Sequence, residues 1–384
     1  MPSPDHAPRT RLRRALWSTA AAALLYAGFS LWPTPASVTQ DGAGTPITVK
    51  VSKKVRELYR TSMSYKDKAL FKWRPATIAY GDQPAQRCEL HARGKSSARF
   101  PRKSLTVRHA TPTAVLPGVS LRRVFLLNLA FDPHGIEMRF ANLLYGELGL
   151  FPPHNQFVRL RTNGSDDGLY LLCERHVNAL QRQHPDLACV LRTNRGGFSA
   201  IWAADDVRLN QIIPDLRATL AIEDPTRRGQ AMQTRFLMEG VVTWMACNSA
   251  MQNGDSVDEA FLYATRNGDG IGPLHIMGWD CDDLIEPPSH PESTLEDPLT
   301  WACESTLERA VLTTPSTRAQ LRAALARVLA GPMSDEAVSA RLDGLSQTLA
   351  VVDPRGREQR EAAIRRFRAC LVERRRTLLG HLRN

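Results

Sequence analysis

The sequence has few cysteines for its length, and none of them forms a metal-binding or redox pair. Its 384 residues include seven cysteines, but no two are spaced as C-x-x-C, which argues against a zinc ribbon or a thioredoxin-like site. The H-E-x-x-H and G-x-S-x-G signatures of zinc proteases and serine hydrolases are also missing. No fixed period indicates a repeat protein. We therefore expect most of the cysteines to be buried free thiols.

Acidic residues are fewer than basic ones. The 39 aspartates and glutamates against 50 lysines and arginines leave a net charge of +11, which suits phosphate-bearing partners, nucleic acid or an anionic membrane surface. Nucleic acid is the weakest of these, because Phe100 is the one Phe, Tyr or Trp interleaved in the basic tract 87–108. Hydrophobic residues at 43% and charged residues at 23% are typical of a folded chain.

One long hydrophobic run occurs, near the N-terminus. Residues 15–32 carry no charge and follow a basic segment, residues 1–14, as in a transmembrane signal anchor or a cleaved signal peptide. At about 1.5 Å per residue, the run is just long enough to cross a bilayer core. Residues 33–46 read as a linker to a body at 47–384. The positive-inside rule places this body outside the cytoplasm, either membrane-anchored or, after cleavage, secreted or periplasmic.

Strand patterns dominate the first half of the body, and helical patterns the second half. Stretches that alternate or run apolar, with many β-branched residues, predict strands at residues 47–51, 76–80, 105–109, 124–129, 157–161 and 169–173. Helices with one apolar face are expected at 136–148 and 236–248, and further helices beyond residue 316. Two hairpins are expected. The first joins the strands at 157–161 and 169–173 through Asn163-Gly164 and has Glu174 at the end of its second strand, and the other lies over 260–279. These patterns predict an α+β fold with a sheet-rich N-terminal half and a helical C-terminal half.

A glycine-containing loop lies inside the basic tract. Gly94, Lys95 and Ser96 stand among several arginines and lysines. Small residues let backbone N–H groups approach phosphate oxygens while a lysine supplies charge, so a nucleoside triphosphate fits such a loop. It is not a Walker A loop, because Glu89 occupies the position of the first glycine. The alternative is a solvated basic face.

Carboxylates follow the expected hairpin and also precede it. Asp280, Asp282 and Asp283 come directly after the apolar run 274–279, and a buried carboxylate must be solvated, paired with a cation or bound to a metal. The D-x-D spacing places two oxygen ligands on one side of an extended chain, as magnesium requires. An acidic loop at a strand end is the alternative. Asp255 precedes the hairpin, and this order resembles the layout of protein-kinase catalytic and metal-binding loops.

Together these segments resemble the spore-coat kinase family typified by CotH, whose members are atypical kinase-like proteins that phosphorylate serine-containing proteins. The resemblance is distributed along most of the body. It rests on Gly94 to Ser97, Phe100 to Ser104, Leu126-Leu127-Asn128, Asp132, Arg139, Gly168 to Glu174, Asn253-Gly254-Asp255, Trp279 to Asp282, Asp353 with Arg357, and Arg374. The resemblance implies an atypical protein-kinase-like, two-lobed fold that uses ATP and Mg²⁺ to phosphorylate a protein substrate.

Individual roles follow from the resemblance by position. Lys103 is expected to contact the ATP phosphates, and Glu174 to orient that lysine. Asp255 would position the acceptor hydroxyl, and Asp280, with Asp282, would hold magnesium.

One departure from the family pattern affects the expected metal site. The family tends to place an asparagine shortly after the loop aspartate, whereas Asp258-Glu259-Ala260 stands here. A catalytically inactive, kinase-like binding module or scaffold at the cell envelope is therefore the alternative function.

Overall fold

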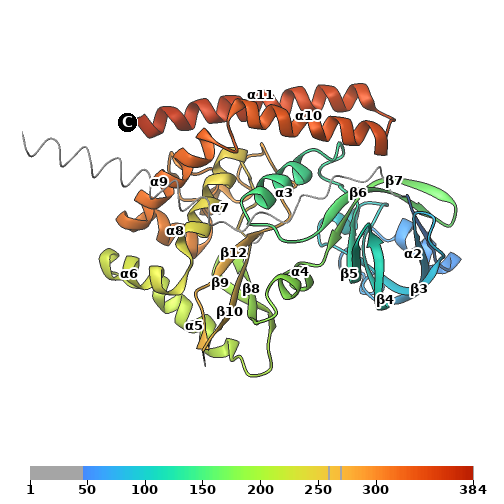
Figure 1. Ribbon diagram of the computed structural model, residues 1–384, viewed down its shortest axis with the longest axis horizontal. Helices are drawn as coiled ribbons and strands as arrows, with labels where there is room; N and C mark the ends of the chain where they lie inside the picture. The colour runs from blue at the N-terminus through green and yellow to red at the C-terminus, as the bar shows by residue number, and fades with distance from the viewer. Residues whose placement is uncertain (1–45, 258–259, 269, 384) are drawn as a thin grey trace, which may run out of the picture. The chain divides into compact units, whose positions relative to one another are not determined.

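The computed structural model describes residues 46–257, 260–268 and 270–383 (Figure 1). The expected basic segment 1–14, the apolar segment 15–32 and all but the last residue of the linker 33–46 lie outside these ranges. Within the described ranges, no helix is both long and apolar enough to cross a membrane.

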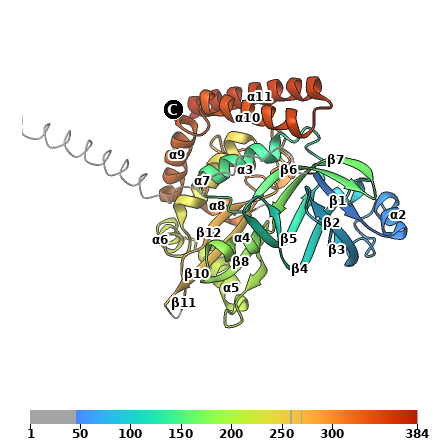
Figure 2. The same cartoon turned by 45° about the vertical axis from the view of Figure 1, so that its right-hand side comes forward.

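The first part of the body is a closed β-barrel (Figure 2). Around the barrel the strands run β1 (Pro46–Lys50), β2 (Arg74–Tyr80), β3 (Gln86–Arg93), β4 (Ser104–Leu116), β5 (Val119–Leu127), β7 (Ser165–Glu174) and β6 (Asn155–Thr162). Helix α2 (Lys53–Thr61) lies between β1 and β2 in the chain. The parallel pairing of β1 with β6 closes the barrel, while the other neighbours are antiparallel. Closure removes the unpaired edges that an open sheet would expose.

The turn between β6 and β7 shows how local sequence sets this pairing. Asn163 and Gly164 both have positive φ, 49° and 83°, and Thr162 pairs with Ser165 across them. A two-residue turn of this kind matches the twist of a hairpin, and Asn-Gly adopts it at low cost. The expected hairpin is therefore confirmed, and its second strand ends at Glu174 as predicted.

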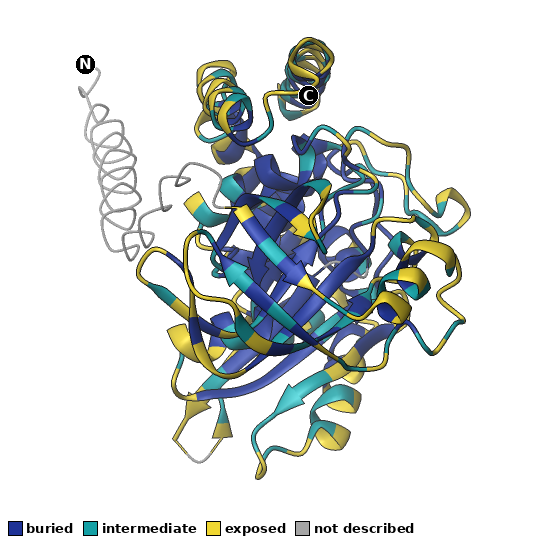
Figure 3. Ribbon diagram, turned by 90° about the vertical axis from the view of Figure 1, so that its right-hand side faces the viewer, coloured by how far each residue is buried: buried dark blue, intermediate teal, exposed yellow. Residues whose placement is uncertain are grey.

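The barrel wall is buried on both faces where it meets the rest of the body. Along β5, Val124 and Leu126 belong to the barrel interior, whereas Phe125 and Leu127 belong to a second, larger core. Successive side chains of a strand point to opposite faces, so one strand serves two cores. Figure 3 shows buried residues along these strands and exposed ones mainly in the loops and on the outer helix faces.

A second sheet follows the barrel in the sequence. It contains β8 (Leu187–Asn194), β9 (Gly197–Ala203), β10 (Ala260–Asn267), β11 (Gly270–Ile271) and β12 (His275–Gly278). The order is β11-β10-β8-β9, and β12 also pairs with β10. The hairpin of β10 and β12 was predicted from the sequence, but β8 and β9 were not.

Apart from α2, the α-helices of the described residues lie mostly in the C-terminal half. They are α3 (Glu137–Glu147), α4 (His176–Gln183), α5 (Leu209–Leu220), α6 (Pro225–Arg235), α7 (Met238–Met251), α8 (Thr306–Thr313), α9 (Pro315–Ala330), α10 (Asp335–Val352) and α11 (Arg357–Arg383). The expectation that α7 has a single apolar face is wrong, because nearly all its residues are buried. The α+β class, with a sheet-rich first half and a helical second half, is confirmed, and all seven cysteines are free.

Candidate functional site

A cleft of about 1470 Å³ lies between the barrel wall and the second sheet. Its lining comes from the loop after β3, the end of β5, the turn between β8 and β9, the loop after α7 and the segment after β12. The cleft therefore collects residues that lie far apart in the sequence. Its charged lining residues are Arg93, Lys95, Arg99, Arg175, Arg192, Arg195, Asp255, Asp280, Asp282 and Asp283.

The loop after β3 depends on a glycine at its first position. Gly94 has φ of +88°, and a Cβ there would lie 1.9 Å from the Ser97 hydroxyl oxygen. The left-handed backbone therefore favours glycine, and any larger residue would also displace the Ser97 side chain. Lys95 and Ser96 follow, are exposed and line the cleft. The loop therefore lies at the cleft.

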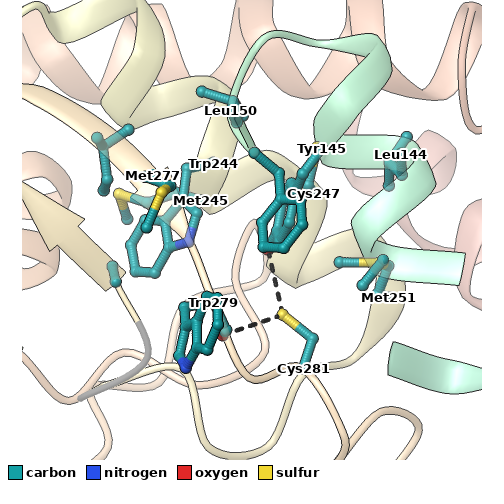
Figure 4. Packing of buried hydrophobic residues seen from close by; sticks show 14 of the residues in the cluster. Leu144, Tyr145, Leu150, Trp244, Met245, Cys247, Met251, Met277, Trp279 and Cys281 are labelled. Atoms are coloured by element: carbon teal, nitrogen blue, oxygen red, sulfur yellow. Dashed lines mark hydrogen bonds between the residues drawn. The ribbon is translucent and has the colours of Figure 1, made fainter. Parts of the chain in front are cut away.

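The acidic segment after β12 alternates between core and cleft. Trp279 and Cys281 are buried, whereas Asp280 and Asp282 line the cleft. Figure 4 shows the Cys281 sulfur between Tyr145 and Trp279, 3.9 Å from the Tyr145 hydroxyl and 3.5 Å from the Trp279 carbonyl oxygen. With Cys281 held in the core, Asp280 and Asp282 both lie on the cleft side, although Asp280 does not have the extended backbone on which the D-x-D expectation was based.

Asp280 has an unusual backbone conformation. Its φ of 55° lies in the left-handed region, which aspartate tolerates better than most residues. Nearby, Gly278 packs so closely on Tyr145 that a Cβ would lie 2.5 Å from the ring. The Tyr145 hydroxyl in turn donates to the side-chain oxygen of Asn248 at 2.7 Å. Packing against α3 and α7 therefore fixes the path of the chain into Asp280.

The carboxylates of this segment influence one another. Burial, followed by the nearby Asp280 and Asp283, raises the pKa of Asp282 well above its ordinary value. Burial and then Asp255 raise the pKa of Asp283 to about 6. Such a cluster favours a bound cation, because a cation offsets like-charge repulsion and desolvation.

Arg93 places a positive charge beside the acidic segment. Its guanidinium lies over the Phe125 ring at 3.9 Å from the centroid. Burial lowers the pKa of Arg93, and the Asp280 carboxylate acts in the opposite direction. The guanidinium of Arg93 therefore lies between the Phe125 ring and the acidic segment.

The donor chemistry at this position fits magnesium. Among the described residues, no group of three or more His, Cys, Asp or Glu side chains is arranged to hold a metal ion. Magnesium commonly uses one or two carboxylates together with substrate phosphates. Asp280 and Asp282 meet that requirement, and the basic lining supplies room for the phosphates.

The loop that carries Asp255 is attached directly to the acidic segment. The Gly254 N–H donates to the carbonyl of Asp283 at 3.0 Å, and the Gly254 carbonyl accepts from Ser289 at 2.8 Å. A Cβ at Gly254 would lie 2.5 Å from the carbonyl oxygen of Pro287. Only glycine allows this approach, so it fixes where Asp255 enters the cleft. Asp258 and Glu259, which replace the expected asparagine region, lie outside the described residues.

Lys103 and Glu174 are not brought together. The Lys103 side chain is 3% exposed, and its amine donates to the carbonyls of Ser62 at 2.6 Å, Ala98 at 2.7 Å and Phe100. All three of its donors are therefore used. Glu174 pairs with Arg182 at 2.9 Å. The expected Lys103–Glu174 pair is not present, and Lys103 does not line the cleft.

The same hydrogen bonds indicate a structural role for Lys103. Ala98 and Phe100 directly follow the Gly94 loop, so the lysine holds the base of that loop through two of its carbonyls. Because its ammonium group is buried and bonded to several carbonyls, we interpret Lys103 as stabilising the local structure rather than binding a ligand.

Sequence reasoning missed several lining residues. Arg192 and Arg195 belong to the unpredicted β8 and its turn, so no pattern connected them with the acidic segment. His176 was also missed; it stacks on Phe261 with ring centroids 4.0 Å apart. Burial, with Arg175 as the next contribution, lowers the pKa of His176 well below its ordinary value, so the ring is neutral at pH 7.

The sequence was compared with models of known protein families. The family model described as "CotH kinase protein" matches residues 90–361. The chain belongs to the CotH kinase family. The matched range covers most of the chain and includes all the charged lining residues of the cleft. None of the curated proteins compared matches the chain.

Proposed function

We propose that this CotH-family chain transfers the γ-phosphoryl group of ATP to a hydroxyl group of a protein substrate. The observation that carries the proposal is the composition of the cleft, which combines a glycine-containing basic loop with Asp255, Asp280 and Asp282. Phosphoryl transfer depends mainly on positioning and charge neutralisation. In this proposal the barrel and the helical part form the two lobes of an atypical kinase-like arrangement.

Each group in the cleft has a role in this proposal. Lys95 and Ser96 bind phosphate oxygens, and Asp280 and Asp282 would hold Mg²⁺. Magnesium, when bound, neutralises phosphate charge. The aromatic surface of His176, Phe261 and Trp279 in the cleft suits a planar base.

Asp255 acts on the acceptor. The acceptor oxygen forms a bond to the γ-phosphorus as the bond to the β,γ-bridging oxygen breaks. ADP leaves, and the hydroxyl proton moves to the Asp255 carboxylate.

The direct test compares aspartate variants in a transfer assay. We expect Asp255→Asn to lower phosphate incorporation into casein, or into the chain itself, by roughly 100-fold while Mg-ATP binding stays nearly unchanged. Asp215→Asn, an exposed aspartate of α5 that is absent from the cleft lining, is the matched control. Equal incorporation by Asp255→Asn and the control would contradict the role of Asp255.

A second function has specific support. Lys103 is held by backbone carbonyls rather than directed into the cleft, so the chain lacks the lysine contact implied by the family resemblance. A catalytically inactive member would act as a binding module or scaffold at the cell envelope. ATP binding without any phosphate incorporation would favour that function.

The proposed location follows from the N-terminal sequence. Residues 15–32 would attach the chain to a membrane or direct its export, with the body outside the cytoplasm. An alkaline-phosphatase fusion at the C-terminus should be active. An inactive fusion together with a fluorescent cytoplasmic reporter would place the body inside instead.

A further inference from the structure

A second concave surface lies on the outer wall of the barrel. This pocket, here called the barrel pocket, has a volume of about 510 Å³. The charged residues of its lining are Arg87, Glu89, Arg108, Arg122, Arg123 and Arg175. Five arginines and one carboxylate leave it strongly basic, and none of the roles proposed for the cleft uses it.

The strand register explains why the arginines gather. Glu89 pairs across the sheet with Arg108, and Arg108 pairs with Arg123. Arg175 follows β7 directly after Glu174, which pairs with Val124. Like charges directly opposite each other in a sheet are unfavourable. The Arg108–Arg123 pair therefore has an energetic cost that an anion would offset.

The available carboxylate offsets only part of this charge. Glu89 forms an ion pair with Arg108, which also lies over the Trp73 ring at 4.2 Å. No ion pair or side-chain hydrogen bond links Arg123 or Arg175 to another residue in the described part of the chain. Burial, and then Arg123, lowers the pKa of Arg175. Two half-buried guanidinium groups thus have donors available for an incoming carboxylate or phosphate.

The barrel pocket and the cleft are neighbours. Arg175 lines both. On β3, Glu89 and Arg93 share the outer face, and the four residue steps from one to the other span about 13 Å at about 3.3 Å each. Arg93 is in the cleft lining. An extended peptide covers that distance in about four residues.

We infer that the barrel pocket docks an acidic segment of the protein substrate and presents a hydroxyl residue about four positions away to the cleft. This inference rests on the proposed phosphotransferase function and specifies its substrate class. The arginines bind carboxylate or phosphate groups of the segment through charge-assisted hydrogen bonds.

Peptide binding tests the docking surface without nucleotide. The probe is a fluorescent peptide with one serine and an Asp/Glu run four residues away, and its neutral counterpart has Asn/Gln in the run. We expect the acidic peptide to bind the full chain with an affinity that falls as salt rises. Arg122→Gln/Arg123→Gln should weaken this binding roughly tenfold, while Arg365→Gln/Arg366→Gln, an exposed arginine pair on α11, should not. The neutral peptide should bind all variants equally weakly.

The outcomes separate docking from catalysis. If Arg122→Gln/Arg123→Gln binds the acidic peptide as tightly as the parent and the α11 control do, the docking surface is wrong, even where phosphate transfer is observed. If the acidic peptide binds through Arg122 and Arg123 but no phosphate is transferred, the docking surface stands and the phosphotransferase proposal fails. Tighter binding of a DNA oligonucleotide of equal charge would also overturn the inference. Circular dichroism melts of each variant establish that it is folded.

Discussion

At the scale of single residues, Lys103 shows how burial changes the role of a charged side chain. Its ammonium group is held by backbone carbonyls at the base of the Gly94 loop. Lys95, by contrast, is exposed and lines the cleft. The two lysines are eight positions apart, and we assign the structural role to the first and phosphate binding to the second.

Substitution distinguishes these two lysines. Lys103→Met leaves several carbonyls without a donor, so we expect the free energy of unfolding to fall by roughly 2–4 kcal/mol. Lys95→Met should change it by less than about 0.5 kcal/mol but should weaken nucleotide binding. Urea unfolding and nucleotide titration of both variants measure these effects. A Lys103→Met variant of parental stability that no longer binds ATP would identify Lys103 as the ligand instead.

At the scale of elements, helix α3 holds the acidic segment from behind. The Glu137 carboxylate, in the first turn of α3, accepts from the Leu284 N–H at 3.1 Å. Burial, and then Asp132, raises the pKa of Glu137 to about 8. The loop of Asp255 contacts the same segment through Gly254 and Asp283. Helix α3 and the loop that carries Asp255 therefore both hold the acidic segment in place.

This contact has a predicted pH dependence. Because the folded-state pKa of Glu137 lies above its unfolded value, its contribution is complete below pH 4.5 and is lost as the pH rises through about 8. Glu137→Gln keeps an acceptor for Leu284 but does not ionise. We expect the variant to gain stability relative to the parent between pH 5 and pH 9, as measured by urea unfolding. A constant difference across that range would show that Glu137 does not titrate there.

The sequence predicted most strands of the barrel but not all of them. The six predicted strands are all present, because each segment either alternates or forms a short apolar run. Strand β3 was missed because its outward positions are Arg87, Glu89, His91 and Arg93, which read as a basic tract. Barrel closure depends on Pro46 pairing near Arg159, and no local pattern reveals a contact so distant in sequence.

At the scale of the whole molecule, the cleft is built from segments that lie far apart in the sequence. The sequence located Lys95, Ser96, Asp255, Asp280 and Asp282, and the fold brings all of them to one cleft. It did not locate Arg192, because that residue belongs to an unpredicted strand. The family resemblance implied that Lys103 contacts the nucleotide, whereas the fold surrounds its amine with backbone carbonyls, which the sequence alone does not reveal.

The most direct test of the Mg-ATP site is ATP binding with and without magnesium, measured by calorimetry on the parent chain and on Asp280→Asn. We predict that the parent binds ATP more tightly with Mg²⁺ than with EDTA. Asp280→Asn should lose about tenfold or more in Mg-ATP affinity, equivalent to about 1.4 kcal/mol, yet match the parent in EDTA. The control, Asp215→Asn, should behave as the parent does. Equal Mg-ATP affinity in Asp280→Asn and the parent, or no ATP binding by either, would contradict the assignment of this cleft.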